Sequence, residues 1–356
     1  MVEPLVVDGS IGEGGGQILR MAVSAAALLS RPVRVVNIRA KRDPPGLRPQ
    51  HMVAVKGVAD LTRGRVEGLS VGSTEIVFYP STPKSGRFVI DAGTAGSTTL
   101  MLQSLLPVAS FATGPVEMEL RGGTNNPMAP PVEYLNWVLM PVLREMGVKA
   151  EIELVRRGFY PRGGGLVRAR VEPVRMLRPI DVGTGRVVRA KVFAYSCNLP
   201  EHIVERMARR ASEGLKRLKV PEVAVETEAL QSPHPKCSLD PGTGVIVVLE
   251  LDNGLAMGFD SLGERGVPAE RVADRAVEEC ARQLRTGAPV DSHLGDQLVI
   301  WVALADGRST YRVTELTGHT ETAVFIAERV IGARFDVESL GDRGARITCD
   351  GIGFSR

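Results

Sequence analysis

One histidine of the chain stands in a setting that suits nucleophilic chemistry. His319 lies in the short polar segment Leu316-Thr-Gly-His-Thr-Glu321, which is predicted to open a helix. The positive end of a helix and its N–H donors suit an anion, and they keep an imidazole neutral, as a nucleophile requires. A helix-capping histidine is the alternative on this local evidence. No Ser/His/Asp spacing, HExxH motif or paired-acid motif competes with His319 in the sequence.

A glycine-rich segment near the N-terminus has the composition of a phosphate-binding loop. Ser10-Ile-Gly-Glu-Gly-Gly-Gly-Gln17 is expected to join a strand to a helix, where backbone N–H groups can hold an anion. It has neither the Lys-Ser/Thr end of a Walker A loop nor the spacing of a dinucleotide fingerprint, and a structural glycine turn is the alternative. Arg20, one turn further on, and Glu13, a carboxylate that packing does not need, favour a functional loop.

Residues 31–51 contain six cations and one acid. Such a concentration predicts a phosphate-binding patch, with a solvated strand edge as the alternative. Arg39 and Arg42 are the strongest candidates, because they lie where the predicted strand 33–39 gives way to a loop, at the same end of the unit as the glycine-rich segment. His51, on the predicted helix that follows, has the pattern of an ordinary helix residue.

The composition favours an ordinary globular protein that contains more than one compact unit. The chain has 356 residues, 44% of them apolar, and a formal net charge of +3, so that a polyanion must be met by a local patch. Four scattered cysteines (Cys197, Cys237, Cys280 and Cys349) argue against a zinc site or a disulfide scaffold. We expect a cytoplasmic protein that does not associate with a membrane. The uncharged segment 92–116 is predicted to be a buried helix with flanking turns, because proline, serine, threonine and glycine interrupt it.

Internal similarity predicts the architecture. Three segments share a strand, a loop, an apolar helix, a second strand, a second helix and a β-rich tail, which predicts an α/β (α+β) fold of three βαβαββ units. Residues 1–183 are expected to hold the first two units of a large domain, and residues 288–356 the third. Residues 184–287 have a βαββα pattern of their own and are predicted to be a smaller inserted α/β domain. The insert contains none of the candidate residues above.

Seven motifs in this order resemble the RNA 3′-terminal phosphate cyclase family, over essentially the full chain. They are Asp8-Gly-Ser-Ile-Gly-Glu-Gly-Gly-Gly-Gln-Ile-Leu-Arg20, Arg39-Ala-Lys-Arg42 with Pro45-Gly-Leu-Arg-Pro-Gln50, Ala92-Gly-Thr-Ala-Gly-Ser-Thr-Thr99, Arg121-Gly-Gly-Thr-Asn125, Gly158-Phe-Tyr-Pro-Arg-Gly-Gly-Gly165, Asp296-Gln297 and Gly318-His-Thr320. The resemblance implies three units similar to the C-terminal domain of translation initiation factor three. It also implies a ligase of RNA processing, which uses ATP to convert an RNA 3′-phosphate into a 2′,3′-cyclic phosphate through histidine-AMP and RNA-adenylate intermediates.

The resemblance further implies roles for particular residues. His319 would be the nucleophile, and Glu13 a ligand of a divalent cation, Mg²⁺ or Mn²⁺. Positions similar to the family's ATP-binding residues are Gln103, Pro130, His293, Leu294, Gly295, Asp296 and Gln297. Those expected to hold the RNA 3′-phosphate or the ATP phosphates are Arg20, Arg39, Arg42 and Gln50. Other members often carry a bulkier or aromatic residue at the position of His293, whose smaller ring would stack less on adenine.

Two other functions are weighed against this expectation. The family has a branch of ribosome-assembly proteins that keep the fold and lack the cyclase histidine, so a non-catalytic RNA-binding protein is the alternative. Gly318-His-Thr320 argues against that branch. A transferase similar to the shikimate-pathway enzyme built from the same unit is disfavoured by the chain length and by the absence of that family's motifs.

Overall fold

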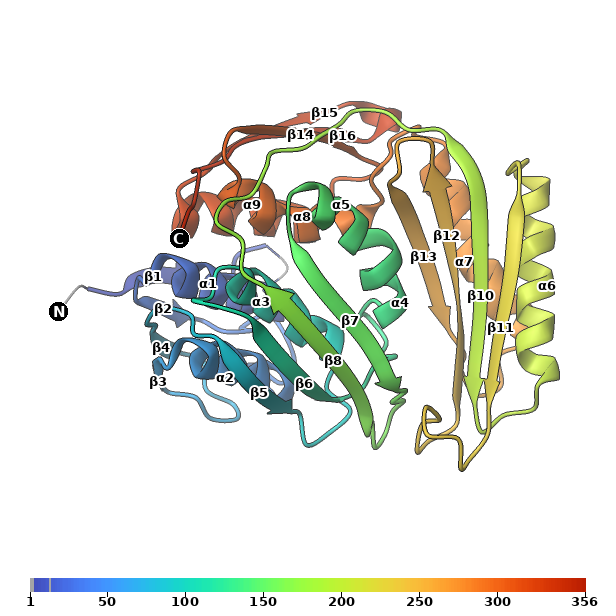
Figure 1. The fold of residues 1–356 in the computed structure, drawn as a ribbon, viewed down its shortest axis with the longest axis horizontal. Coiled ribbons are helices and arrows are strands. Elements are labelled where there is room, and N and C mark those ends of the chain that lie inside the picture. Colours follow the sequence, from blue (N-terminus) through green and yellow to red (C-terminus); the bar gives the residue numbers. More distant parts are fainter. Residues whose placement is uncertain (1–2, 13) are drawn as a thin grey trace.

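The computed structural model describes residues 3–12 and 14–356. The chain forms a mixed α/β fold with four four-stranded sheets, which confirms the predicted mixture of helices and strands (Figure 1). Three sheets surround a central group of helices, and the fourth lies to one side of them with its own helices.

The first sheet is formed by the N-terminal residues. Its elements are β1 (Leu5–Asp8), α1 (Gly16–Leu29), β2 (Val33–Val36), α2 (Pro49–Thr62), β3 (Arg65–Glu67) and β4 (Ile76–Tyr79). The strand order is β1-β2-β4-β3, and β1 is parallel to β2 while the other pairs are antiparallel. Strand β2 ends three residues earlier than predicted, because Asn37 and Arg39 have left-handed backbone angles of φ 53° and 54°.

The second sheet repeats this order as β5-β6-β8-β7. Its elements are β5 (Gly86–Asp91), α3 (Thr98–Ser110), β6 (Val116–Gly122), α4 (Val132–Tyr134), the π-helical turn η1 (Leu135–Leu139), α5 (Met140–Glu145), β7 (Lys149–Arg156) and β8 (Gly165–Glu172). The uncharged segment forms α3, which is almost entirely buried, as predicted. The helix predicted over residues 131–146 is interrupted by the π-helical turn.

The third sheet is assembled from two distant parts of the chain. Its elements are β9 (Asp181–Val182), α8 (Ser292–Leu304), β14 (Arg308–Val313), α9 (Gly318–Ile326), the π-helical turn η2 (Ala327–Ile331), β15 (Arg334–Ser339), the 3₁₀ turn η3 (Gly341–Arg343) and β16 (Ala345–Asp350). Strand β9 pairs in parallel with β14, in the position that β1 and β5 have in their sheets. The sequence pattern missed β9, since two residues are too short to give a periodic signal.

The fourth sheet lies between β9 and α8 in the chain. Its elements are β10 (Val187–Cys197), α6 (His202–Arg217), β11 (Val223–Leu230), β12 (Gly242–Leu251), β13 (Ala256–Leu262) and α7 (Ala269–Leu284). The predicted βαββα pattern is wrong by one strand, because β13 was not expected. Strand β13 follows β12 after a short turn at Gly254 (φ 82°), and its sequence Ala-Met-Gly-Phe-Asp-Ser-Leu has little β-branched character.

Small and apolar residues let the central helices approach one another closely. Helix α1 contacts α2, α3 and α9, and α8 contacts α9. The run Ala25-Ala-Ala27 of α1 is completely buried. These contacts bring the N-terminal ends of α1 and α9 together, although their residues are about three hundred positions apart. Among the described residues, none of the helices combines the length and apolar character needed to cross a bilayer.

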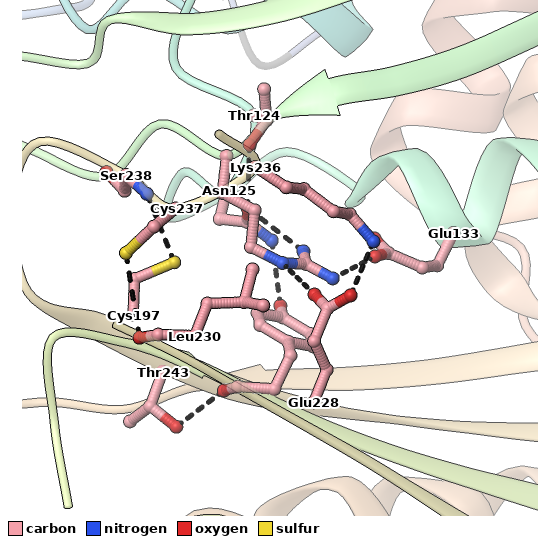
Figure 2. A network of polar contacts seen from close by, with 12 residues as sticks. Thr124, Asn125, Glu133, Cys197, Glu228, Leu230, Lys236, Cys237, Ser238 and Thr243 are labelled. Carbon is pink, nitrogen blue, oxygen red and sulfur yellow. Dashed lines mark hydrogen bonds and ion pairs between the residues drawn. The ribbon is translucent and has the colours of Figure 1, made fainter. Parts of the chain in front are cut away.

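A buried ionic network joins the fourth sheet to the second. Arg157, which is 0% exposed, donates to Glu133 Oε1 at 2.6 Å and to Glu228 Oε1 of β11 at 2.7 Å. Lys236 also binds Glu228, at 2.5 Å. In Figure 2, Glu133, Glu228 and Lys236 lie close together, and Asn125 lies beside them. The orientation of the fourth sheet relative to the second therefore depends on a fully desolvated guanidinium.

Candidate active site

His319 lies at the amino end of α9, as the sequence predicts. Thr317 caps the helix, and its Oγ1 accepts a hydrogen bond from the Thr320 N–H at 3.1 Å. The imidazole is half-buried. At this position it faces the positive end of the helix dipole, which favours the neutral ring.

Gln17, in the first turn of α1, connects His319 to Asp296. Its Nε2 donates to Asp296 Oδ2 at 2.7 Å, so that its Oε1 faces His319 Nδ1 at 2.8 Å. A carbonyl oxygen can only accept, and in a neutral imidazole this contact therefore places the proton on Nδ1 and leaves Nε2 unprotonated. In this tautomer, Nε2 is the ring nitrogen that carries the lone pair.

Asp296 is held by a helix whose amino end is fixed from two sides. Asp291 caps α8 by accepting the N–H groups of His293 and Leu294 at 3.0 and 2.9 Å. The hydroxyl of Tyr134 and the backbone N–H of Gly258, in β13, also donate to Asp291, at 2.7 and 3.0 Å. The fourth sheet thus helps to position the helix that carries Asp296.

Burial raises the pKa of Asp296 from 3.8 to about 7, with His293 and Arg20 opposing this rise and Asp291 adding to it. The unfolded chain loses the proton near the ordinary value, while the folded chain keeps it until about pH 7. As the pH rises from 3.8 to about 7, the fold therefore loses the stability that the protonated carboxyl of Asp296 contributes.

Asp296→Asn should consequently stabilise the fold at about pH 8 and leave it unchanged below about pH 4, because the amide keeps an acceptor for Gln17 and does not ionise. Urea unfolding of both proteins across this range measures the difference. Asp350→Asn is the control, since the hydrogen bond from Arg308 lowers the pKa of Asp350 and predicts no gain at high pH. A constant difference between Asp296→Asn and wild type at every pH would contradict this assignment.

A cleft opens beside Asp296 and Gln17. Its other lining residues are Arg20, Met21, Gln103, Leu106, Leu139, Gln297, Ile300 and Trp301. Apolar walls with a few polar groups are typical of a small-molecule site. The enclosed part measures about 50 Å³, which suits a few water molecules, so a purine requires side chains at the mouth to move.

Gln297 presents an unsatisfied acceptor in this cleft. Its Nε2 donates to the carbonyl oxygen of His293 at 3.2 Å, whereas its Oε1 is buried with no hydrogen-bond partner among the described residues. A buried acceptor without a partner costs about 1–3 kcal/mol. An amino group of a bound ligand, such as that of adenine, would satisfy it.

Four arginines gather on the other side of the glycine-rich segment. We call Arg20, Arg39, Arg42 and Arg48 the arginine cluster. Burial lowers the pKa of Arg39, and the neighbouring charges of Arg48 and Arg42 lower it further. Burial also lowers the pKa of Arg20 to about 10, which Asp296 partly offsets. Like charges at close range repel one another and lower one another's pKa, and a bound anion relieves this repulsion.

His51 lies against this cluster and is 5% exposed. Its Nδ1 accepts the Arg48 N–H at 3.2 Å. Burial lowers the pKa of His51 to about 3, and Arg20, Arg39 and Arg48 add to the effect. The ring is therefore neutral at physiological pH, with its proton on Nε2, so that it adds no charge to a phosphate site. Sequence reasoning did not place this histidine in the site, because His51 has the pattern of an ordinary helix residue.

The glycine-rich segment brings the arginine cluster close to α9. A Cβ at Gly12 would lie 2.2 Å from Thr322 Oγ1 of α9, and one at Gly16 would lie 2.4 Å from His51 Nε2 and 3.1 Å from Arg20 Nη1. Arg42 Nη2 lies 3.8 Å from the corresponding position at Gly15. Glycine is required at 12 and 16 because neighbouring side chains fill the space. The structure thus brings His319, Asp296, Arg20 and Arg42 around one loop.

Arg39 also has a structural role that its position in the sequence did not indicate. Its Nη1 donates to the carbonyl oxygens of Pro44 and Gly46 at 2.8 and 3.0 Å, which holds the loop before α2. Gln50 is exposed in the first turn of α2, and its Cβ lies 3.4 Å from the position a Cβ would take at Gly96.

Four of the predicted ATP-binding residues do not line the cleft. Pro130 is half-buried in the loop before α4, and His293 is exposed in the first turn of α8. Leu294 is 1% exposed and belongs to the core, while Gly295 is needed for packing, because a Cβ there would lie 2.8 Å from Val313 Cγ1. Of the predicted set, Gln103, Asp296 and Gln297 face the cleft.

The predicted metal ligand, Glu13, lies outside the described residues. Within residues 3–12 and 14–356, no three histidine, cysteine, aspartate or glutamate side chains form a group that could hold a metal ion. A nucleotide-bound Mg²⁺ needs one or two protein carboxylates and takes its other ligands from phosphates and water. A protein cage is therefore not required for the predicted cation.

Comparison with known proteins gives one consistent result. A model of the family described as RNA 3′-terminal phosphate cyclase matches residues 11–337. The chain is 45% identical to the RNA 3′-terminal phosphate cyclase of Methanopyrus kandleri over 97% of both chains. It is 44% identical to that of Pyrobaculum neutrophilum, covering 98% of this chain and 99% of the relative. It is 46% identical to that of Hyperthermus butylicus, over 92% and 91% respectively.

Proposed function

The chain belongs to the RNA 3′-terminal phosphate cyclase family, and from this premise we propose that it converts an RNA 3′-phosphate into a 2′,3′-cyclic phosphate at the expense of ATP. The observation that carries the proposal is the arrangement of His319, Gln17 and Asp296 beside the arginine cluster. This arrangement places a neutral imidazole of defined tautomer, which can act as the nucleophile, beside a site for anions.

In the first step, Nε2 of His319 attacks the α-phosphorus of ATP. A nitrogen–phosphorus bond forms, the bond to the bridging oxygen breaks, and pyrophosphate leaves. Gln17 Oε1 accepts a hydrogen bond from Nδ1–H throughout, and the positive charge that develops on the ring is stabilised through Gln17 by the carboxyl of Asp296. Asp296 thus acts as a positioning residue.

In the second step, an oxygen of the RNA 3′-phosphate attacks the same phosphorus, and His319 is released as a neutral imidazole. In the third step, the neighbouring 2′-hydroxyl attacks the 3′-phosphorus, loses its proton and expels AMP. The ribose holds these two groups together, so the closure is intramolecular and has a large effective molarity.

The cleft beside Gln17 would take the adenine of ATP. Gln103 and Gln297 supply polar contacts there, and Met21 and Trp301 supply apolar walls. A divalent cation would be held by the triphosphate, with Glu13 as its protein ligand, and would screen the charge of the phosphates. Pro130, His293, Leu294 and Gly295 lie outside the lining of this cleft and would contribute to the ATP site through the loop before α4 and the first turns of α8.

The arginine cluster would bind the 3′-phosphate of the RNA together with Gln50. A dianionic terminal phosphate offers more charge than an internal diester, and guanidinium groups can bind it bidentately. Nη1 of Arg39 is engaged by the loop carbonyls, so Arg39 would bind a phosphate through its remaining donors.

Arg42→Ala should slow AMP transfer from the adenylated protein to RNA by about 10-fold or more, as expected for a lost charged hydrogen bond, and should affect adenylation less. Single-turnover measurements of the two half-reactions test this. Arg34→Ala is the control, because Arg34 is an exposed β2 residue paired with Glu75. If adenylation falls first while transfer persists, Arg42 serves the triphosphate instead.

We further propose that the three sheets of equal strand order are copies of one unit related to the C-terminal domain of initiation factor three. On this proposal they form a large domain with the smaller domain of residues 184–287 inserted. The protein would act in the cytoplasm. The direct test of function is incubation of 3′-phosphorylated RNA with ATP, where a terminus that resists phosphatase indicates the cyclic product. An unchanged terminus would favour the non-catalytic, RNA-binding alternative.

A further inference from the structure

A second pocket lies apart from the cleft, at the carboxyl ends of β5 and β6. It has a volume of about 370 Å³ and is bounded by three chain segments: the loop after β5, the end of β6, and the hairpin between β7 and β8. Its lining residues are Asp91, Gly93, Thr94, Glu119, Arg121, Gly122, Arg156, Arg162, Gly164, Gly165 and Leu166. None of the roles proposed above uses this pocket.

The charges of this pocket favour an anion. The lining contains three arginines and two carboxylates, and one of these arginines, Arg162, is paired at 2.8 Å with Asp240, which is not a lining residue. Both carboxylates are already engaged: Glu119 binds Arg121 at 2.6 Å, and Asp91 accepts the Gly93 N–H at 2.7 Å. Arg156 donates through Nε to the Gly164 carbonyl at 2.6 Å and has no carboxylate partner among the described residues. Its remaining donors are therefore available to a ligand.

The shape of the pocket is set by close backbone packing. A Cβ at Gly122 would lie 2.3 Å from the Gly96 carbonyl oxygen, and one at Gly163 would lie 2.7 Å from Ala95 Cα. Of the described lining residues, Leu166 alone is large and apolar, and none is aromatic. Such a surface cannot stack a base, and it suits a hydrated sugar-phosphate backbone.

The pocket repeats the position of the glycine-rich segment in the neighbouring sheet. Asp91 accepts the Gly93 N–H at 2.7 Å, and Asp8 accepts the Ser10 N–H at 2.9 Å. Arg121 lies at the end of β6 in the second sheet, and Arg39 follows β2 in the first. The loop after β5 also lies near the first turn of α2, since a Cβ built at Gly96 would lie 3.4 Å from Gln50 Cβ.

We propose that this pocket binds a phosphodiester of the RNA strand on the 5′ side of its terminal phosphate. The inference rests on the proposed function, because it takes the end of the RNA to lie at the arginine cluster. It predicts that binding strength depends on the length of the RNA and not on its base sequence.

The test compares Arg156→Ala with wild type by fluorescence anisotropy, using labelled RNA of about twelve nucleotides and a labelled dinucleotide, both 3′-phosphorylated. The variant should bind the longer RNA about 3- to 10-fold more weakly, with a salt slope that is lower by about one, and should bind the dinucleotide as wild type does. Arg87→Ala, which removes an exposed arginine of β5 paired with Glu117, should change neither.

Thr94→Asp provides a second variant, which adds a negative charge at the rim while keeping an acceptor for the Gly96 N–H. It should also weaken binding of the longer RNA alone. Unchanged affinity for the longer RNA in both variants, or equal losses for both RNAs, would overturn the proposal. Wild-type protein that binds neither RNA would instead overturn the proposed function, and this inference with it.

Discussion

Replacing His319 with alanine should abolish transfer of AMP from ATP to the protein, because it removes the imidazole whose Nδ1 is held by Gln17 and whose Nε2 is the proposed nucleophile. Removal of a covalent nucleophile lowers such a rate by several orders of magnitude, on the order of 10⁴-fold or more. Incubation with α-labelled ATP, followed by denaturing electrophoresis, measures the adduct. The fold should be retained, since the imidazole is half-buried at a helix end and outside the core.

His319→Asn is a second variant for the same measurement, because asparagine is polar but cannot form the phosphoramidate. Gln17→Leu distinguishes positioning from nucleophilic attack. It removes the acceptor that holds the Nδ1 proton, so it should leave a slow adenylation reaction with an altered pH profile. Wild-type adduct on either His319 variant would remove this residue from the mechanism.

Replacing Arg157 with methionine should lower the free energy of unfolding by about 3–5 kcal/mol, because it leaves Glu133 buried without its cation and leaves Glu228 with Lys236 alone. Burial by itself lowers the pKa of Arg157, but the two carboxylates raise it overall, so the guanidinium remains charged. The ring of Tyr195 lies 4.1 Å from the guanidinium carbon and adds a cation–π contact. Figure 2 shows Glu133, Glu228 and Lys236 close together in this network.

Denaturant unfolding monitored by tryptophan fluorescence measures this loss. Arg170→Ala is the matched control: Arg170 is an exposed arginine of β8 paired with Glu172, and its removal should cost less than about 1 kcal/mol. Adding Glu133→Gln to Arg157→Met should recover part of the loss, because it removes one orphaned charge. Arg157→Met with near wild-type stability, or a double variant weaker than the single one, would show that the network is not held by this charge.

The effect of Arg157→Met should also diminish in acid. Arg157 and Lys236 lower the pKa of Glu228 from 4.5, against the effect of its burial. A carboxylate of this kind contributes stability above its ordinary pKa and loses it as the pH falls through the lowered value. The difference between wild type and variant should therefore be largest near neutral pH.

Local sequence patterns predicted the helices of the central group, and with them the position of His319. The helical setting of His319 follows from Thr317-Gly-His319, because a threonine before a helix caps it. The buried helix of residues 92–116 follows from its uncharged composition. These features depend on residues within one or two turns of each other, where periodicity and capping chemistry are informative.

The contacts that assemble the site could not be predicted in the same way. Gln17 binds His319 and Asp296 across separations of 302 and 279 residues, and no local pattern reports such a contact. His51 has the spacing of an ordinary helix residue, and only the packing of α2 against Gly16 places it beside Arg20. Strand β9 belongs to the third sheet although the fourth sheet intervenes in the chain. Resemblance to a family supplied the chemistry, but not the role of Gln17.

The most direct test of the central claim is to map the bound nucleotide. The wild-type protein should be incubated with α-labelled ATP, digested, and the labelled peptide identified by mass spectrometry, in parallel with a chase by 3′-phosphorylated RNA. We predict that AMP is attached to Nε2 of His319, that the bond is labile in acid, and that the RNA chase removes the label. AMP on another residue, or a label at His319 that 3′-phosphorylated RNA does not remove, would contradict the account.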